Sequence, residues 1–202
     1  MIIKPFTLIL IVLFITSTIS CYDIKDAKGT LLKTQQSRDF SVYDHSGRHV
    51  DSTSFDSVSI LTFLFSNCTN VCPIVVSNIK QSLNTNSKYE KIPVIIISVD
   101  PEHDSDESVQ KYMDKWELDN NWYYITGSES TLQTIWKDYY INPQAIRGQK
   151  SITQALKMRN KIAHTSPVFI LNREGAAVLV HTNPINPESL YHDIDLIAKI
   201  SD

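Results

Sequence analysis

Basic clusters, glycine-rich stretches and cysteines are all scarce in this sequence. The 202 residues include 19 basic and 22 acidic side chains, which give a formal net charge of −3. The basic residues do not gather into a Lys/Arg-rich block. Nucleic-acid-binding proteins usually carry a patch of positive charge, so nucleic acid is not expected as a partner. The five glycines and eight prolines are spread out, which excludes a low-complexity linker or a repeat array after residue 30. The length then suits one compact domain.

The N-terminal segment differs in kind from the rest of the chain. Lys4 precedes an uninterrupted apolar run, Leu8–Ile15, and small polar residues then lead to Cys21, which is the layout of a signal peptide. Counted generously, from Ile2 to Ile19, the apolar segment is 18 residues long, which is marginal for crossing a membrane. Cys21 also stands where a lipid-modified cysteine would follow cleavage.

We therefore predict three parts. Residues 1–21 are a signal peptide or a membrane or lipid anchor, residues 22–37 are a tether, and residues 38–202 are the folded domain. Whether the first part is cleaved, lipidated at Cys21 or retained, the domain is expected on the extracytoplasmic side of a membrane.

Two apolar, β-branched runs mark the centre of the predicted fold. Runs as continuous as Val58–Phe65 and Pro93–Val99 are typical of strands that are covered on both faces of a sheet. Between them, Pro73 suits the first turn of a helix, and the apolar residues after it fall on one helical stripe. A strand, a helix and a strand in this order predict a parallel pair of strands.

The other predicted elements extend this unit on both sides. A parallel half, followed by an antiparallel hairpin and a last helix, is a thioredoxin-like α/β fold, with a central mixed sheet flanked by helices. The sequence adds an N-terminal β-hairpin extension and an insertion before the late strand. The predicted elements are a hairpin at Phe40–Val50, a helix headed by Asp104, a strand at Trp122–Ile125, a helix at Thr131–Tyr139, the basic surface insertion at residues 142–161, a hairpin of Pro167–Leu171 with Ala176–His181, and a helix at Pro187–Ile200.

Cys68 and Cys72, in the sequence SNCTNVCP, are the only cysteines of the predicted domain. They fall in the turn between the first core strand and its helix. Outside the cytoplasm, two cysteines this close are expected to form a disulfide or to share a metal ion. Cys72 precedes Pro73 at the predicted helix N-terminus, where free N–H groups and the helix dipole favour a thiolate. A low thiol pKa suits both metal binding and disulfide exchange.

His164 stands just before the predicted strand Pro167–Leu171, which in a thioredoxin-like fold runs beside the cysteine turn. Two thiolates and an imidazole form a soft donor set that suits Cu(I), and the same set can also hold Cu(II) or Zn(II). On its own, however, a histidine before a strand is more often a loop residue than a ligand. A purely structural Cys68–Cys72 disulfide is a further alternative, although so short a loop would stabilise the fold little.

Three segments occur in a distinctive order. They are SNCTNVCP after the first core strand, SVDPEHD at the end of the second, and AHTSPVFILNREG before the late hairpin. Together they resemble the Sco/SenC family of copper proteins, and the likeness extends over residues 38–200. The resemblance implies a membrane-tethered, thioredoxin-like protein that acts in assembling the dinuclear copper site of cytochrome c oxidase. It also implies that Cys68, Cys72 and His164 are the copper ligands.

The family's D-P-x-x-D motif matches Asp100, Pro101 and Asp104. Asp100 ends a core strand near the expected site. It is a candidate for orienting the cysteine turn or supporting it electrostatically without binding the metal itself. Alternatively, Asp104 caps the next helix, and the acidic motif complements the positive end of that helix. We expect His103 to be exposed. The other histidines, expected to be solvated, are His45, His49, His181 and His192.

The principal functional prediction is a metallochaperone that delivers copper, as Cu(I) or Cu(II), to cytochrome c oxidase or prepares its dinuclear copper site. Its expected partners are the copper-receiving subunit of the oxidase and other copper or thiol proteins. The alternative is an extracytoplasmic thiol–disulfide oxidoreductase that uses Cys68 and Cys72. Pro167 favours that alternative, because its position resembles the cis-proline that lies against the cysteine turn in thioredoxins. Both functions remain open on the sequence alone.

Overall fold

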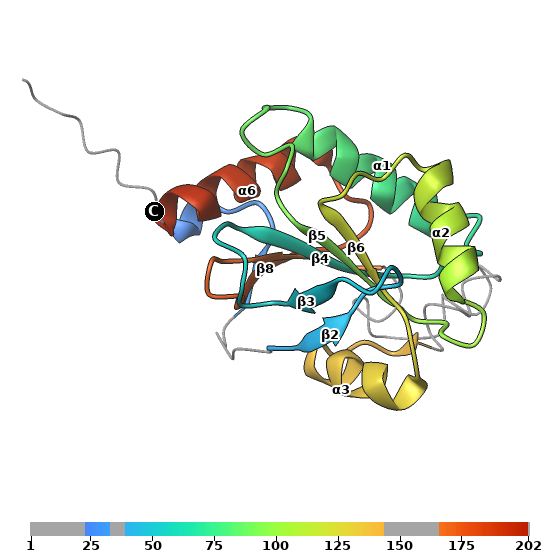
Figure 1. The fold of residues 1–202 in the computed structure, drawn as a ribbon. Coiled ribbons are helices and arrows are strands. Elements are labelled where there is room, and N and C mark those ends of the chain that lie inside the picture. The colour runs from blue at the N-terminus through green and yellow to red at the C-terminus, as the bar shows by residue number, and fades with distance from the viewer. Residues whose placement is uncertain (1–22, 33–38, 144–165, 202) are drawn as a thin grey trace, which may run out of the picture.

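A mixed sheet of six strands forms the centre of the computed structural model, which describes residues 23–32, 39–143 and 166–201 (Figure 1). The strands of this sheet are β1 (Thr30–Leu31), β4 (Ser59–Leu64), β5 (Val94–Ser98), β6 (Trp122–Ile125), β7 (Val168–Leu171) and β8 (Ala177–His181), and those of a separate hairpin are β2 (Ser41–Tyr43) and β3 (His49–Asp51). The order across the sheet is β1–β8–β7–β4–β5–β6. β4, β5 and β6 are parallel, whereas β7, β8 and β1 continue the sheet in antiparallel pairs, which confirms the predicted mixed α/β architecture.

β4 and β5 lie in the middle of the sheet and are buried along their whole length. A strand covered on both faces needs an unbroken apolar run, so the two strands predicted from such runs are confirmed. In their parallel register, Leu64 lies opposite Ser98. The carboxyl ends of β4 and β5 therefore meet at one edge of the sheet.

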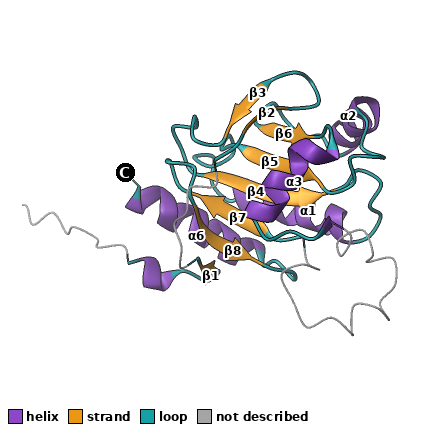
Figure 2. Ribbon diagram, turned by 90° about the horizontal axis from the view of Figure 1, so that it is seen from below, coloured by secondary structure: helices purple, strands orange, loops and turns teal. Residues whose placement is uncertain are grey.

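Four α-helices cover the sheet within the described residues (Figure 2). They are α1 (Val71–Leu83), α2 (Asp106–Lys115), α3 (Glu129–Asp138) and α6 (Pro187–Ile200), and a single 3-10 turn, η1 (Ile24–Asp26), precedes β1. α1 and α6 lie side by side on one face, and α3 covers the opposite face. α1 and α2 follow successive parallel strands, and the right-handed sense of such crossovers places both helices on the same face.

α2 and α3 begin at serine caps. Ser105 Oγ accepts a hydrogen bond from the N–H of Ser108 at 3.3 Å, and Ser128 Oγ accepts one from the N–H of Thr131 at 3.2 Å. The prediction that Asp104 caps α2 is therefore wrong. The serine directly before the helix takes the cap, and the Asp104 side chain turns inwards instead.

The predicted N-terminal hairpin, β2 and β3, closes over the outer edge of β6. The N–H of His45 donates to the carbonyl oxygen of Tyr124 at 2.9 Å, and Arg48 Nη2 donates to the carbonyl oxygen of Trp122 at 2.7 Å. The carboxylate of Asp44, which is buried, pairs with Arg48 at 2.7 Å and fixes the direction of the guanidinium. The hairpin is thus joined to the sheet by backbone groups of its outer strand.

The N-terminal segment that we predicted as part of a tether belongs to the fold. η1 and β1 both lie within residues 22–37, and β1 pairs with β8. The N–H groups of Lys28 and Gly29 donate to the carboxylate of Asp193 at 2.9 and 2.7 Å. Gly29 passes so close that an added Cβ would lie 2.8 Å from His181 Nε2. The sequence pattern missed this segment because its partner on α6 is 164 residues away from Gly29.

Asp193 is fully buried and also contacts two histidines. Its Oδ2 lies 2.9 Å from His181 Nε2, and its Oδ1 lies 2.9 Å from His192 Nδ1. Burial alone would raise the pKa of Asp193, but hydrogen bonds from the two imidazoles and the amides of Lys28 and Gly29 lower it to about 2. His181 is 7% exposed, so the prediction that it is solvated is wrong, whereas His192 keeps part of its ring at the surface.

Three sequence-based predictions concern the ends and loops of the chain. Cys21 and nearly all of the insertion at residues 142–161 lie outside the described residues. No helix in the described ranges is long and apolar enough to cross a membrane. In those ranges the cis peptide bond precedes Pro184 and not Pro167, so the resemblance of Pro167 to the thioredoxin cis-proline is one of position in the sequence alone.

Candidate metal and thiol site

Cys68 and Cys72 lie between β4 and α1, at the carboxyl ends of the parallel strands. β4 ends at Leu64 and α1 begins at Val71, so Cys72 is inside the first helical turn and Cys68 precedes it. Both are free thiols, and Cys72 is 1% exposed whereas Cys68 is half-buried. Loops at this edge of an α/β sheet often carry binding sites, because rigid strands position them and solvent reaches them. The Cys68 sulfur is therefore accessible, whereas Cys72 is buried.

Cys68 is the thiol whose ionisation the surroundings favour. The S–H of Cys72 donates to the Cys68 sulfur, and the N–H groups of Asn70, Cys72 and Val71 also point at it, with Cys72 N at 3.4 Å. Together these donors outweigh burial and lower the pKa of Cys68 to about 6. Asn70, at the cap position of α1, makes no capping hydrogen bond through its side chain. The Cys68 sulfur occupies that place instead, where the helix N-terminus stabilises negative charge.

Cys72 shows the opposite behaviour. Its hydrogen bond to Cys68, its burial and the negative charge of the Cys68 thiolate all raise the pKa of the Cys72 thiol. The prediction that the helix N-terminus favours a Cys72 thiolate is therefore wrong. Cys72 lies inside the first turn and faces the core, so the helix amides act on the sulfur that precedes them. At neutral pH the pair consists of one thiolate and one thiol.

Asp104 is a carboxylate, 2% exposed, that lies behind the cysteine loop. Its Oδ1 accepts hydrogen bonds from the N–H and the hydroxyl of Ser66 at 2.9 and 2.6 Å. Its Oδ2 accepts from the hydroxyls of Ser98 at 2.6 Å and of Tyr124 at 2.9 Å. Because Ser66 precedes Cys68 by two residues, Asp104 ties the cysteine loop to β5 and β6. Its negative charge also contributes to the raised pKa of Cys72.

Asp100 occupies a different position from Asp104. Its Oδ1 lies 3.0 Å from Nδ1 of His103, and its carbonyl oxygen accepts from the N–H of Asp104 at 2.9 Å. His103 is exposed, as predicted. Support of the cysteine turn by Asp100 stays a prediction, whereas Asp104 is the carboxylate that the structure joins to that turn. The signal that could have revealed this role is Ser105, since a serine directly before a helix leaves the preceding aspartate without a capping role.

His164 lies outside the described residues, so its role as a ligand stays a prediction. β7, which follows it in sequence, is antiparallel to β4, with Val168 opposite Thr62. Thr62 Oγ1 also donates to the carbonyl oxygen of Pro167 at 3.0 Å. β7 therefore begins at the same edge of the sheet as the cysteine loop. Among the described residues no three Cys, His, Asp or Glu side chains gather into a possible metal site, and the predicted set takes its third ligand from His164.

Known proteins resemble this chain in sequence and in fold. A family model described as SCO1/SenC matches residues 28–199. The SCO1 protein homolog of Bacillus subtilis (strain 168) is 27% identical over 141 residues, which are 67% of this chain and 68% of that protein. Yeast Sco1 with copper bound superposes with a TM-score of 0.61 at 21% identity, covering 81% of this chain and 92% of that one. BsSco, described as a member of the Sco family of cytochrome c oxidase assembly proteins, gives a TM-score of 0.63 at 19% identity, covering 87% and 97%.

These similarities settle the fold and the family. The solved Sco proteins superpose on the mixed sheet and its flanking helices, so the predicted thioredoxin-like fold is confirmed. The family model spans nearly all of the described chain, from the Asp193-bound segment at Lys28, through both cysteines, to the last turn of α6. The protein is therefore a member of the Sco/SenC family.

Proposed function

We propose that this protein binds copper through Cys68, Cys72 and His164, and that it delivers the metal to, or prepares, the dinuclear copper site of cytochrome c oxidase during assembly. Membership of the Sco/SenC family and the copper bound by yeast Sco1 support this proposal. The N-terminal segment, or a lipid on Cys21, would anchor the domain on the extracytoplasmic side of the membrane. There it would meet the copper-receiving subunit of the oxidase and other copper or thiol proteins.

The observation that carries the proposal is the unequal pair of sulfurs. With a pKa of about 6, the Cys68 thiolate can take up a metal ion at neutral pH without first losing a proton. Cys72, next to it, supplies a second sulfur when metal binding displaces its proton. Two thiolates are soft donors that suit Cu(I) at low coordination number. Because Cys68 is only half-buried, ligands of a receiving protein can reach the metal and replace this sulfur.

Anaerobic titration of the reduced protein with Cu(I), Cu(II) and Zn(II) tests this function. We expect one tight copper site that is lost or greatly weakened in Cys68→Ser and in His164→Ala. His49→Ala is the matched control, because His49 is an exposed histidine on the hairpin, bonded to Ser41 at 2.8 Å. Absence of copper binding in the wild type, or full binding in both site variants, would contradict the proposal.

The same pair of sulfurs favours a second function, thiol–disulfide exchange. The Cys68 thiolate attacks a target disulfide, which forms a mixed disulfide and releases one target thiolate. Cys72 then loses its proton and attacks the Cys68 sulfur, which releases the second target thiolate. The target gains two electrons, and the Cys68–Cys72 disulfide carries the oxidised state. A disulfide switch has been described for BsSco, which has the same fold.

His164→Ala separates the two functions. If copper delivery is the function, this variant loses copper affinity, whereas disulfide exchange needs only the two sulfurs and should persist. The measurement is the rate at which the reduced protein reduces a disulfide-bonded peptide, with Cys68→Ser as the inactive control. An exchange rate no faster than that of Cys68→Ser in the wild type would rule out the second function.

A further inference from the structure

Ser66 joins the cysteine loop, residues 65–70, to the strands beside it. Its N–H and its hydroxyl both donate to Oδ1 of Asp104, at 2.9 and 2.6 Å. One carboxylate oxygen can accept two such bonds, and together they fix the backbone and the side chain of Ser66. Two residues later the chain reaches Cys68, the half-buried sulfur of the pair. The position of Ser66 therefore influences the position of that sulfur.

The cysteine loop is held at its two ends. Near its start, Ser66 donates to Asp104, and at its far end the Cys68 sulfur accepts a hydrogen bond from the N–H of Cys72 at 3.4 Å, inside the first turn of α1. The middle of the loop consists largely of exposed residues, which are Asn67, Thr69 and Asn70. Exposed side chains contribute little to the order of a loop, so its order depends on the contacts at the two ends.

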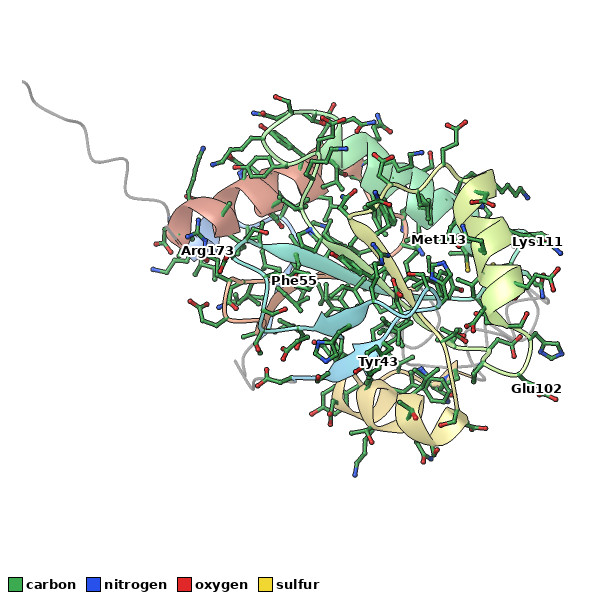
Figure 3. The ribbon with its side chains drawn as sticks, in the orientation of Figure 1. Tyr43, Phe55, Glu102, Lys111, Met113 and Arg173 are labelled. Carbon is green, nitrogen blue, oxygen red and sulfur yellow. The ribbon has the colours of Figure 1, made fainter. Side chains whose placement is uncertain are left out.

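Asp104 is fixed from its other side. It lies in the loop between β5 and α2 and is buried, whereas Glu102 of the same loop points outwards to solvent (Figure 3). The second carboxylate oxygen, Oδ2, accepts from the hydroxyls of Ser98 in β5 at 2.6 Å and of Tyr124 in β6 at 2.9 Å. Both of these residues are fully buried. Two strands of the sheet thus hold the carboxylate to which Ser66 is bonded.

The three hydroxyls that donate to Asp104 differ in what they join to it. Those of Ser98 and Tyr124 come from β5 and β6, which are already paired with each other in the sheet. Loss of either hydroxyl leaves both strands in place. The hydroxyl of Ser66 comes from a segment outside the sheet. Its loss therefore removes a contact that orders the cysteine loop.

We propose that Ser66 is a positioning residue of the metal site, whose hydrogen bonds to Asp104 keep the Cys68 sulfur beside Cys72. The inference rests on the proposed function, because it concerns the affinity of these two sulfurs for copper. A loop that is already ordered loses less conformational entropy when it binds a metal than a loop that must first be ordered. Ser66 thus raises the metal affinity without contacting the metal.

Ser66→Ala removes the hydroxyl and keeps the backbone amide. We expect the affinity for Cu(I), measured anaerobically by competition with a chelator, to fall about tenfold, the effect expected for one lost hydrogen bond to a charged group. Ser66→Thr keeps a hydroxyl at this half-exposed position and should retain wild-type affinity. Unchanged affinity in Ser66→Ala, or an equal loss in Ser66→Thr, would overturn the inference.

Ser98→Ala is the matched control. It makes the same chemical change at the same carboxylate, and the hydroxyl that it removes also lies 2.6 Å from Asp104, but this hydroxyl belongs to β5. We expect both alanine variants to lose stability in urea, whereas Ser98→Ala should keep wild-type affinity for Cu(I). An equal loss of affinity in the two variants would show that the position of the cysteine loop is not the cause, and would overturn the inference.

Hydrogen exchange tests the role of Ser66 even if the wild type binds no copper and the proposed function fails. The N–H of Cys68 donates to the carbonyl oxygen of Phe65 at 3.2 Å, so its exchange reports the order of the loop in the metal-free protein. We expect this amide to exchange about tenfold faster in Ser66→Ala and at the wild-type rate in Ser98→Ala. Equal exchange rates in the wild type and in Ser66→Ala would overturn the role of Ser66 independently of copper.

Discussion

Two buried aspartates hold different regions of this molecule, and their partners differ in kind. Asp104 accepts hydrogen bonds from neutral donors, the hydroxyls of Ser66, Ser98 and Tyr124 and one backbone amide. Asp193 is hydrogen-bonded to two histidine rings and to two backbone amides of the N-terminal segment. Each carboxylate joins parts of the chain that lie far apart in sequence.

The difference teaches what a buried charge does to its surroundings. Two imidazoles and two backbone amides hold the Asp193 carboxylate as a clamp, and these hydrogen bonds lower its pKa to about 2. Neutral donors leave the charge of Asp104 uncompensated, and that charge contributes to the raised pKa values of Cys72 and Tyr112. The first aspartate therefore stabilises the fold, and the second also tunes the thiols.

The largest expected effect comes from removing the clamp. Asp193→Ala leaves the buried amides of Lys28 and Gly29 and the ring of His181 without their acceptor, which should lower the free energy of unfolding by about 3 kcal/mol. Urea denaturation measures this loss, and hydrogen exchange of the two amides reports release of β1. If the comparison holds, reactivity of Cys68 is unchanged in the folded variant. A loss below about 1 kcal/mol would mean that Asp193 is not a clamp.

Acid provides a reversible way to weaken the same clamp. The pKa of Asp193 is lowered from 3.8 to about 2, so its contribution to stability is fully present above about pH 4 and is lost as the pH falls towards 2. The shift corresponds to about 2 kcal/mol at 1.4 kcal/mol per unit. Urea midpoints measured between pH 5 and pH 2 test this, with Asp193→Asn as the control in which this part of the pH dependence disappears. Identical profiles for the two proteins would contradict the assignment.

Asp104→Asn should act on the thiols more than on the fold. The amide oxygen can keep some of the donors, and the hydroxyls of Ser98 and Tyr124 can rotate, so the expected loss of stability is about 1 kcal/mol. Removal of the negative charge should lower the pKa of Cys72 and speed its alkylation at alkaline pH, which peptide mass spectrometry can follow. Asp193→Asn is the matched control and should leave both thiols unchanged. Equal thiol reactivity in the two variants would show that Asp104 does not affect the thiols more than Asp193 does.

The smallest effect concerns the two sulfurs themselves. In the metal-free reduced protein, alkylation of Cys68 by iodoacetamide should rise with pH around a midpoint near 6, while buried Cys72 reacts slowly. The S–H of Cys72 is the largest contribution to the lowered pKa of Cys68, so Cys72→Ala should raise the midpoint. Cys72→Ser, which keeps a donor, should raise it less. A midpoint above 8 in the wild type would show that Cys68 is not activated.

The sequence predicted those features that depend on local pattern. The apolar runs gave β4 and β5, and the helix Pro187–Ile200 was predicted with the bounds that α6 has. The position of the cysteine pair followed from the same local order of elements.

What the sequence pattern missed depends on contacts between distant residues. The pairing of Asp193 with Gly29 brings together residues 164 positions apart, and the bonds of Asp104 to Ser66 span 38 positions. The assignment of the thiolate to Cys68 depends on which sulfur faces the helix amides. A shift of one residue changes the direction in which a side chain points. Hydrophobic periodicity does not specify that direction for the two cysteines.

The hairpin and β1 have a consequence for how the protein meets other chains. An exposed edge of a sheet presents unpaired backbone groups on which another polypeptide can add a strand, and this is a common route to aggregation. Here β1 pairs with β8 at one edge, and at the other His45 and Arg48 take up the carbonyl oxygens of Tyr124 and Trp122 in β6. Along these contacts the backbone groups of β8 and β6 are already paired, so strand addition to these two strands is disfavoured.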